Sequence, residues 1–368
     1  MDELEKARLT INEVDKKMAE LFEKRMEAVK TVGLYKKERG IPVLDVEREK
    51  KVISNNLKNL ENEELKHYYL DWLKGTMAVS RKFQHDLIDG VNIAYSGVEG
   101  AFAYMAAESI FPDGNYCSYP NFTEAYRAVE KGECAYAVLP IENSYAGEVG
   151  QVLDLLYSGS LFINGVYDLP IVQNLLVKKG TDISEIKTVI SHPQALMQCV
   201  DFIREHNFKE VQATNTAVAA KMVAEGDDKT VAAIASTSTA NLYGLEILEH
   251  SINESSSNTT RFAVFADARN DKLAYKDNVF ILIFTVNNTA GSLARAIDVI
   301  GECGFNMRVL RSRPDKTQAW NYYFYAELEG DSRSEKGQKM FEELKKCCAK
   351  LKLVGNYNAA LTMENIQE

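Results

Sequence analysis

The chain has 368 residues, of which 46% are hydrophobic and 26% charged, as expected of a soluble globular protein with two or three domains. Its formal net charge of −10 disfavours nucleic-acid and membrane-surface partners, because both of these present anions. No apolar run approaches the roughly 20 residues of a bilayer-spanning helix, and Met1-Asp2-Glu3 does not begin a signal peptide. We therefore expect a cytoplasmic protein.

The six cysteines and five histidines show neither the spacing of a zinc site nor that of a disulfide framework. The thiols fit a reducing compartment. We expect no metal and no organic cofactor.

Residues 1–88 have the pattern of an all-α module. Apolar residues recur at spacings of three and four, as in a long amphipathic helix, and Gly40 and Pro42 end that helix. A second helix is predicted to start near Asp45 and a third to run from about 63 to 87. Three helices are thus expected.

Cations occur among the apolar residues of these helices. Arg25 interrupts the apolar row of the first helix, and an unpaired buried charge is strongly unfavourable. A structural ion pair, or an arginine that reaches solvent, would also explain its position. The polar residues of the module suit a small dicarboxylate, and they are Arg25, Lys36, Asp45, Arg48, Glu49, Ser80 and Gln84.

Arg8 lies 17 residues before Arg25, so the two are roughly 25 Å apart on a straight helix. One small ligand cannot contact both. If Arg8 serves a site, that site belongs to another protomer, which predicts a dimer with interleaved helices.

The order of these residues, with Val32-Gly33 and Pro42-Val43, resembles the all-helical chorismate mutase family across the whole segment. The resemblance implies Lys36 and Gln84 as catalytic residues and a ligand set completed by Arg8 from a partner. Rearrangement of chorismate to prephenate needs no acid, base or nucleophile. Fixed cations would hold both carboxylates in the reactive conformer and stabilise the developing charge.

Residues 91–268 alternate strands and helices, with polar clusters where strands end. Such positions collect ligands in open α/β sheets, although each cluster alone could be turn or capping chemistry. The clusters are Gly97 to Gly100, Glu142-Asn143-Ser144, Ser191-His192-Pro193-Gln194-Ala195 and Thr259-Thr260-Arg261-Phe262.

Together these clusters resemble the prephenate dehydratases, which implies two α/β lobes like those of periplasmic binding proteins, with prephenate between them. The reaction loses CO₂ and expels a ring hydroxyl, and the poor leaving group must receive a proton. The resemblance assigns that proton to Thr260. Asn143 and Ser144 would be catalytic with it, as groups that polarise Thr260 or fix the departing hydroxyl.

The implied substrate-binding residues are Glu142, Ser191, Gln198, Arg261 and Phe262. Arg261 could hold a carboxylate or brace the cleft.

Residues 278–363 predict a βαββαβ order, which is ferredoxin-like. The segment resembles an ACT domain and implies feedback by L-phenylalanine. A purely dimerising module is the alternative. The implied allosteric residues lie in two runs, Ala290-Gly291-Ser292-Leu293 and Arg311-Ser312-Arg313-Pro314. Arg311 replaces the glutamate of the family motif.

The chain as a whole therefore resembles the multidomain, bifunctional chorismate mutase/prephenate dehydratases. This resemblance implies an enzyme of phenylalanine biosynthesis that takes chorismate through prephenate to phenylpyruvate, as a homodimer or higher homo-oligomer. Two alternatives stay open. One is a sensor that binds small acids without chemistry, and the other is a dehydratase whose helical module only dimerises.

Overall fold

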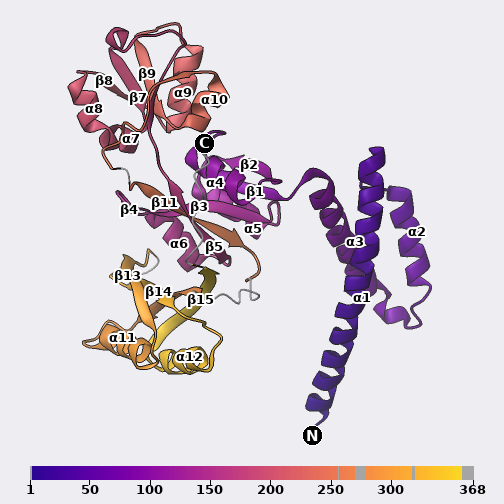
Figure 1. The fold of residues 1–368 in the computed structure, drawn as a ribbon. Helices are drawn as coiled ribbons and strands as arrows, with labels where there is room; N and C mark the ends of the chain where they lie inside the picture. Colours follow the sequence, from indigo (N-terminus) through magenta and orange to yellow (C-terminus); the bar gives the residue numbers. More distant parts are fainter. Residues whose placement is uncertain (1, 256, 270–277, 317–319, 359–368) are drawn as a thin grey trace. The chain divides into compact units, whose positions relative to one another are not determined.

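The computed structural model describes residues 2–255, 257–269, 278–316 and 320–358. It consists of two compact units, Met1–Val91 and Asn92–Glu368. Figure 1 shows the helices and strands of both. Within the described ranges, no helix is long and apolar enough to cross a membrane.

The first unit is made of three helices, as the apolar spacing predicts. They are α1 (Glu3–Arg39), α2 (Val46–Leu57) and α3 (Lys66–Asp89), with the short 3-10 helix η1 (Glu63–Leu65) before α3. The ends are set by ordinary caps, since Gly40 closes α1 in the left-handed conformation and Asp45 accepts a hydrogen bond from the Arg48 backbone N–H. Helix α3 packs along α1.

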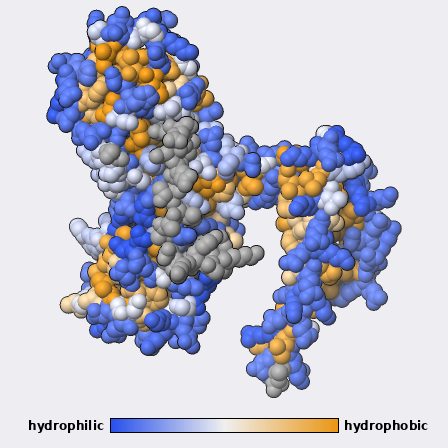
Figure 2. Space-filling model, in the orientation of Figure 1, coloured by the Kyte–Doolittle hydropathy of each residue, from blue (hydrophilic) through white to orange (hydrophobic). Residues whose placement is uncertain are grey.

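Helix α1 leaves most of its apolar residues on the surface of the chain. Gly33 is its only buried residue, and Figure 2 shows apolar side chains exposed along the helix. Leu21 is 66% exposed and Leu4 is 57% exposed. Large apolar surfaces of this kind mark interaction sites.

The second unit begins with a lobe built on a mixed sheet. Its strands are β1 (Asn92–Ser96), β2 (Asn115–Tyr119), β3 (Tyr136–Asn143), β4 (Gly147–Glu148), β5 (Phe162–Pro170) and β11 (Thr259–Ala266). Its helices are α4 (Phe102–Ile110), α5 (Phe122–Glu130) and α6 (Gly150–Ser158). Strand β11 returns late in the chain and runs antiparallel between β3 and β5.

Strand β3 is longer than the sequence analysis predicts. A strand ending before Pro140 is expected, but pairing with β11 continues through Glu142 and Asn143. The register shifts beside Pro140, which has no N–H to donate, and this bulge leaves Ile141 unpaired. The polar residues expected in a loop are therefore held in a sheet.

The second lobe has a five-stranded sheet in the order β10-β6-β9-β7-β8. Its strands are β6 (Asn174–Val177), β7 (Thr188–Ser191), β8 (Lys209–Gln212), β9 (Val231–Ala235) and β10 (Glu246–Glu249). Its helices are η2 (Ile183–Glu185), α7 (Pro193–Gln198), α8 (Val200–Glu205), α9 (Thr216–Glu225) and α10 (Thr237–Tyr243). The chain passes between the lobes twice, from β5 to β6 and from β10 to β11 (Figure 1).

The C-terminal segment has the predicted βαββαβ order. Its elements are β12 (Asn278–Val286), α11 (Ser292–Glu302), β13 (Asn306–Pro314), β14 (Tyr322–Glu329), α12 (Glu335–Cys347) and β15 (Cys348–Asn358). The last five residues of the predicted domain, 359–363, lie outside the described ranges. Strand β15 also pairs with β5 at Gly355 and Ile163, so this segment and the first lobe share one ten-stranded sheet.

Candidate active sites

The three helices of the first unit enclose a cavity of about 260 Å³. Its polar lining residues are Arg25, Lys36, Asp45, Arg48, Glu49, Ser80, Arg81 and Gln84. The structure thus brings together every residue predicted for this site except Arg8. Arg81 is an addition that the sequence analysis missed, although it lies one position after Ser80.

Hydrogen bonds within the cavity hold its cations in place. Arg25 donates to the Ser80 hydroxyl, and Arg81 donates to Glu49. The Lys36 ammonium donates to the Val43 carbonyl at 2.6 Å. Arg25, Lys36 and Arg81 are therefore held before any ligand arrives.

Gln84 is buried in the same cavity. Its Nε2 donates to the Ser80 carbonyl at 3.3 Å, and its Oε1 has no hydrogen-bond partner among the described residues. Buried polar atoms of proteins are normally hydrogen-bonded. Gln84 therefore has hydrogen-bonding capacity left for a ligand.

Arg8 lies outside this cavity. It is exposed near the start of α1, far along the helix from Arg25, as its sequence separation requires. The cavity of one chain is therefore formed without it.

The cleft between the two lobes of the second unit has a volume of about 230 Å³. Its polar lining residues are Asn143, Gln173, His192, Gln194, Gln198, Thr214, Asn215, Thr216 and Thr260. Among the described residues that line it, none is lysine or arginine. Helices α4 and α9 begin at this lining, at Phe102 and Thr216, and the start of a helix favours anions.

Thr260 and Asn143 face each other across β11 and β3. Asn143 Nδ2 donates to Thr260 Oγ1 at 3.0 Å and to Asn258 Oδ1 at 3.0 Å. Its Oδ1 accepts from the backbone N–H of Ala146 at 2.8 Å. The amide is thus fixed from both ends. Because Thr260 accepts this hydrogen bond, its own hydroxyl hydrogen stays available for donation into the cleft.

Five residues predicted to bind substrate or act beside Thr260 lie outside the cleft lining. Ser144 bridges Thr259 N–H and the Ser257 carbonyl, whereas Ser191 donates to the Ile234 carbonyl and is fully buried. Phe262 is a core residue. The other two, Glu142 and Arg261, pair with each other on the opposite face of the sheet, because adjacent strand residues point to opposite faces.

Gln173 and His192 line the cleft and are missing from the predicted site. Gln173 is 2% exposed, and its Oε1 has no hydrogen-bond partner among the described residues. His192 caps α7 by accepting from Gln194 N–H at 3.2 Å, and burial lowers its pKa, which favours the neutral imidazole. The Ser-His-Pro cluster was a signal for His192, but no motif marks Gln173.

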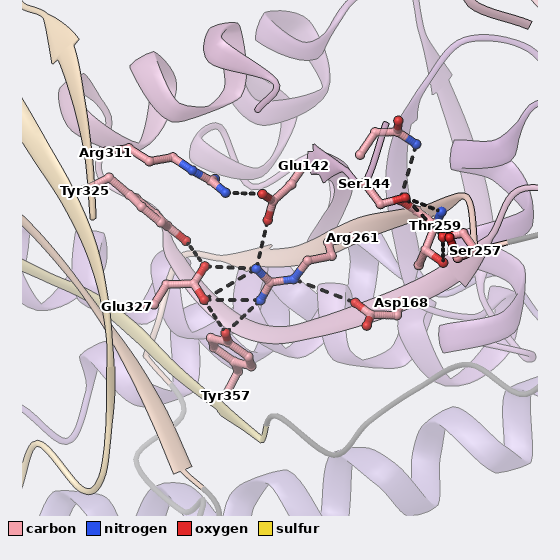
Figure 3. A network of polar contacts seen from close by, with 11 residues as sticks. Glu142, Ser144, Asp168, Ser257, Thr259, Arg261, Arg311, Tyr325, Glu327 and Tyr357 are labelled. Atoms are coloured by element: carbon pink, nitrogen blue, oxygen red, sulfur yellow. Dashed lines mark hydrogen bonds and ion pairs between the residues drawn. The ribbon is translucent and has the colours of Figure 1, made fainter. Parts of the chain in front are cut away.

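Arg261 forms a polar network behind the cleft (Figure 3). Its guanidinium donates to Glu142 at 3.1 Å, to Glu327 at 3.2 Å and to the Tyr357 hydroxyl at 2.7 Å. Burial works against the charged guanidinium, but the Glu327 carboxylate and its other anionic neighbours raise the pKa of Arg261 well above its usual range. Glu142 also accepts a hydrogen bond from Arg311.

The C-terminal segment has a third cavity, of about 320 Å³, lined by Leu293 and Ser312 of the predicted allosteric set. Arg311 and Arg313 alternate with Ser312 along β13 and bind Glu142, Glu148 and Asp154 of the first lobe instead. The remaining predicted residues lie near this cavity without lining it: Ala290 and Gly291 form the turn before α11, Ser292 begins α11, and Pro314 ends β13.

The described residues contain no group of three or more histidine, cysteine or acidic side chains arranged to hold a metal ion. The two candidate sites instead consist of fixed cations on helices and of a hydroxyl with amides between two α/β lobes. A cavity lined by cations and a cleft where two helices begin are features of an enzyme that acts on small carboxylic acids.

Comparison with known proteins agrees with this assignment of class. Residues 7–85 match the family model for chorismate mutase type II, and residues 93–270 match that for prephenate dehydratase. The bifunctional chorismate mutase/prephenate dehydratase of Buchnera aphidicola is 31% identical, with 94% of each chain covered. That of Aquifex aeolicus is 30% identical, with 99% of this chain and 100% of the relative covered.

Two solved structures resemble 73% of this chain. The prephenate dehydratase of Arthrobacter aurescens in complex with L-Phe has a TM-score of 0.69 and 25% identity, with 90% of that chain covered. GqqA, described as a quorum-quenching acylase, has a TM-score of 0.67 and 29% identity, with 98% covered.

The chain belongs to the bifunctional chorismate mutase/prephenate dehydratase family. It rearranges chorismate to prephenate and converts prephenate to phenylpyruvate, in phenylalanine biosynthesis. Both alternatives from the sequence analysis, a sensor without chemistry and a dehydratase with a merely dimerising helical module, are thereby set aside.

Proposed function

We propose that the cavity of α1 to α3 is the mutase site, that the cleft around Thr260 is the dehydratase site, and that L-phenylalanine regulates the chain through its C-terminal segment. The observation that carries the proposal is the hydrogen bond from Asn143 to Thr260 at the cleft lining, in which the threonine oxygen accepts and its own hydrogen stays available for donation.

In the mutase site, Arg25 and Arg48 hold the two carboxylates of chorismate. Lys36 and Gln84 interact with the ether oxygen, where negative charge develops as its bond breaks. Fixed donors stabilise such charge without reorganising during the reaction. The cation-lined cavity supports these roles, and so does the second N–H of the Gln84 amide, since only one is needed for the Ser80 carbonyl.

A second copy of the chain completes the mutase site. The exposed apolar residues of α1 pack against α1 of the partner, and Arg8 of one chain enters the cavity of the other. Support comes from the exposure of that surface and from the distance between Arg8 and Arg25 along one helix.

In the dehydratase site, Thr260 gives its proton to the ring hydroxyl as that group leaves with the electrons of its C–O bond. Loss of CO₂ from the ring carbon supplies the electron pair that completes the aromatic ring. The starts of α4 and α9 bind the substrate carboxylates, since the lining offers no cationic side chain for them. Gln173 and Gln198 hydrogen-bond the substrate from the second lobe.

The C-terminal segment acts as an ACT domain. The cavity lined by Leu293, Ser312 and Phe324 has apolar and hydrogen-bonding groups that suit an aromatic amino acid. The related dehydratase structure from Arthrobacter aurescens is in complex with L-Phe. Because Arg311 binds Glu142 and not a ligand, the lost family glutamate does not prevent L-phenylalanine from binding.

The test adds chorismate to the purified full-length protein and follows prephenate and phenylpyruvate over time, with and without L-phenylalanine. Both products should form in sequence, and L-phenylalanine should slow the second step. Prephenate that accumulates without phenylpyruvate would reject the dehydratase assignment. Unchanged rates, with no binding of L-phenylalanine by calorimetry, would instead favour a purely dimerising C-terminal segment.

A further inference from the structure

Two neighbouring residue pairs on β3 and β11 face opposite sides of the sheet. Thr260 pairs with Asn143, and Arg261 pairs with Glu142. The first pair lines the cleft, whereas the second faces the C-terminal segment. Side chains that hold Arg261 and Glu142 therefore also set the positions of Thr260 and Asn143, because one peptide bond in each strand joins the two pairs.

Three strands of the C-terminal segment hold this second pair (Figure 3). Strand β14 contributes Glu327 and β15 contributes Tyr357, both bound to Arg261, while β13 contributes Arg311, bound to Glu142. Figure 3 shows these side chains converging on Arg261 and Glu142 from one side.

Glu327 is the most deeply buried charged member of the network. Its side chain is 1% exposed and is in contact with two of the Arg261 nitrogens. The hydroxyls of Tyr325 and Tyr357 each donate to it at 2.7 Å. Every oxygen of the carboxylate is thus bonded, and a network satisfied in this way is rigid.

We propose that Glu327 is a positioning residue for dehydration: by holding Arg261 it fixes Thr260 against Asn143, so that the C-terminal segment supplies part of the support of the dehydratase site. Glu327 does not contact the substrate. The proposal rests on the assignment of Thr260 to the dehydratase reaction.

The first test compares Glu327→Gln with Glu329→Gln in the full-length protein. Gln keeps the shape of the side chain but removes the charge that holds Arg261. Glu329 lies on the same strand, is half-exposed and bonds Asn306 and Arg308 away from β11. We expect kcat for prephenate to fall about 10²-fold in Glu327→Gln, the scale of a misplacement near 1 Å, with KM changed less than about threefold.

Two further variants separate positioning from misfolding. Tyr357→Phe removes only the hydroxyl that joins Arg261 and Glu327, and we expect kcat to fall about 10-fold. Its control is Tyr116→Phe, which loses a hydroxyl hydrogen bond to the Phe111 carbonyl elsewhere in the first lobe. Glu327→Asp keeps the charge and should regain most of the kcat lost in Glu327→Gln.

Several outcomes would overturn the proposal. A parental kcat in both Glu327→Gln and Tyr357→Phe would show that Thr260 is held without the network. An increase in KM at constant kcat would place Arg261 in substrate binding. An equal loss in Glu329→Gln would indicate general destabilisation. If the parent itself formed no phenylpyruvate, the assignment of the cleft to dehydration would be rejected. Parental rates in the variants would instead reject only the positioning role of Glu327.

Discussion

Thr260 is the residue to which we assign proton donation, and its hydroxyl is a weak acid at the cleft lining. Its hydroxyl accepts from Asn143, whose other amide atom is held by backbone N–H groups of the following turn. Because Nδ2 of this fixed amide donates to the Thr260 oxygen, the hydroxyl hydrogen of Thr260 stays available for donation.

Replacing Thr260 with valine should nearly abolish dehydration. The shape of the side chain is kept, but the proton donor is lost, so we expect kcat for prephenate to fall roughly 10³-fold. Thr259→Val is the matched control, because the Thr259 hydroxyl bonds the Ser257 carbonyl outside the cleft. Mutase rates measured on the same samples should equal those of the parent. Loss of both activities would indicate misfolding instead.

Lys36 and Lys37 provide a second matched pair at the mutase site. Lys36 lines the cavity, whereas the neighbouring Lys37 donates to the Leu87 carbonyl and does not line it. Removing one fixed donor of developing charge costs about 10² or more in kcat. We therefore expect that loss in Lys36→Ala and a nearly parental rate in Lys37→Ala, measured by the disappearance of chorismate. Similar rates in the two variants would contradict the role of Lys36.

Sequence reasoning named several residues that line the two cavities, but not how their neighbours are oriented. Lys36, Gln84, Asn143 and Thr260 stand in motifs and line the sites as expected. Because adjacent residues of a strand point to opposite faces of the sheet, Arg261 points away from Thr260. The sequence motif alone does not show which face each residue occupies. Gln173 was missed because a single buried amide between two strands has no sequence signature.

Helix α1 is the element whose surface the single chain covers least. Its apolar residues are exposed, and its Arg8 lies far along the helix from the cavity that Arg25 lines. Both observations are explained if α1 packs against a second copy, since a twofold dimer gives each chain the same partner surface.

A heterodimer tests this arrangement directly. Arg8→Ala and Gln84→Ala each disable the mutase, and the two variants are co-expressed with different tags so that only mixed dimers are purified. If Arg8 acts in the partner's cavity, one of the two sites regains both residues, and about half of the parental rate per chain should return. A mixed dimer as inactive as its parents would show that Arg8 acts within its own chain.

The pairing of Glu327 with Arg261 predicts how stability changes with pH. Burial alone would raise the pKa of Glu327, but Arg261 and the hydroxyls of Tyr325 and Tyr357 lower it below the ordinary value of 4.5. A carboxyl whose pKa is depressed in the folded state stabilises that state above its unfolded pKa, and this contribution is lost as pH falls through the folded pKa.

Urea unfolding at pH values above and below 4.5 should reveal this contribution. The parent loses part of its free energy of unfolding on acidification, whereas Glu327→Gln is less stable at neutral pH and loses less on acidification. The half-exposed Glu329 contributes little, so Glu329→Gln should follow the parent. Parallel pH curves for the parent and Glu327→Gln would contradict the ion pair.

At the scale of the whole molecule, the division into segments could be predicted, but the way they join could not. Apolar spacing marks the helical module, and the order of strands and helices marks the βαββαβ segment, whereas the two lobes are implied by the resemblance to the prephenate dehydratases. The pairing of β15 with β5 has no local signal, because a contact between distant residues is set by packing. The sequence also does not predict the contact of Arg311, because its partner Glu142 lies 169 residues away.

Gly355 is the residue at which the C-terminal segment meets the first lobe. A Cβ at this position would overlap the backbone of Ile163, whereas one at Gly301 would meet no atom within 4 Å. Gly355→Ala should therefore lower the dehydratase rate several-fold and weaken its response to L-phenylalanine. Gly301→Ala should leave both near parental values. Assays of both variants at several concentrations of L-phenylalanine check this, and normal inhibition of Gly355→Ala would contradict it.

The same strand pair determines when this protein can complete its fold during synthesis. Strand β5 is made midway along the chain, but its partners β11 and β15 follow it by about a hundred and about two hundred residues. Until those strands leave the ribosome, both edges of β5 remain open to foreign strands, a known route to aggregation. In a nascent chain of this protein, the middle segment with β5 should thus depend on chaperones longest. The first three helices can form early.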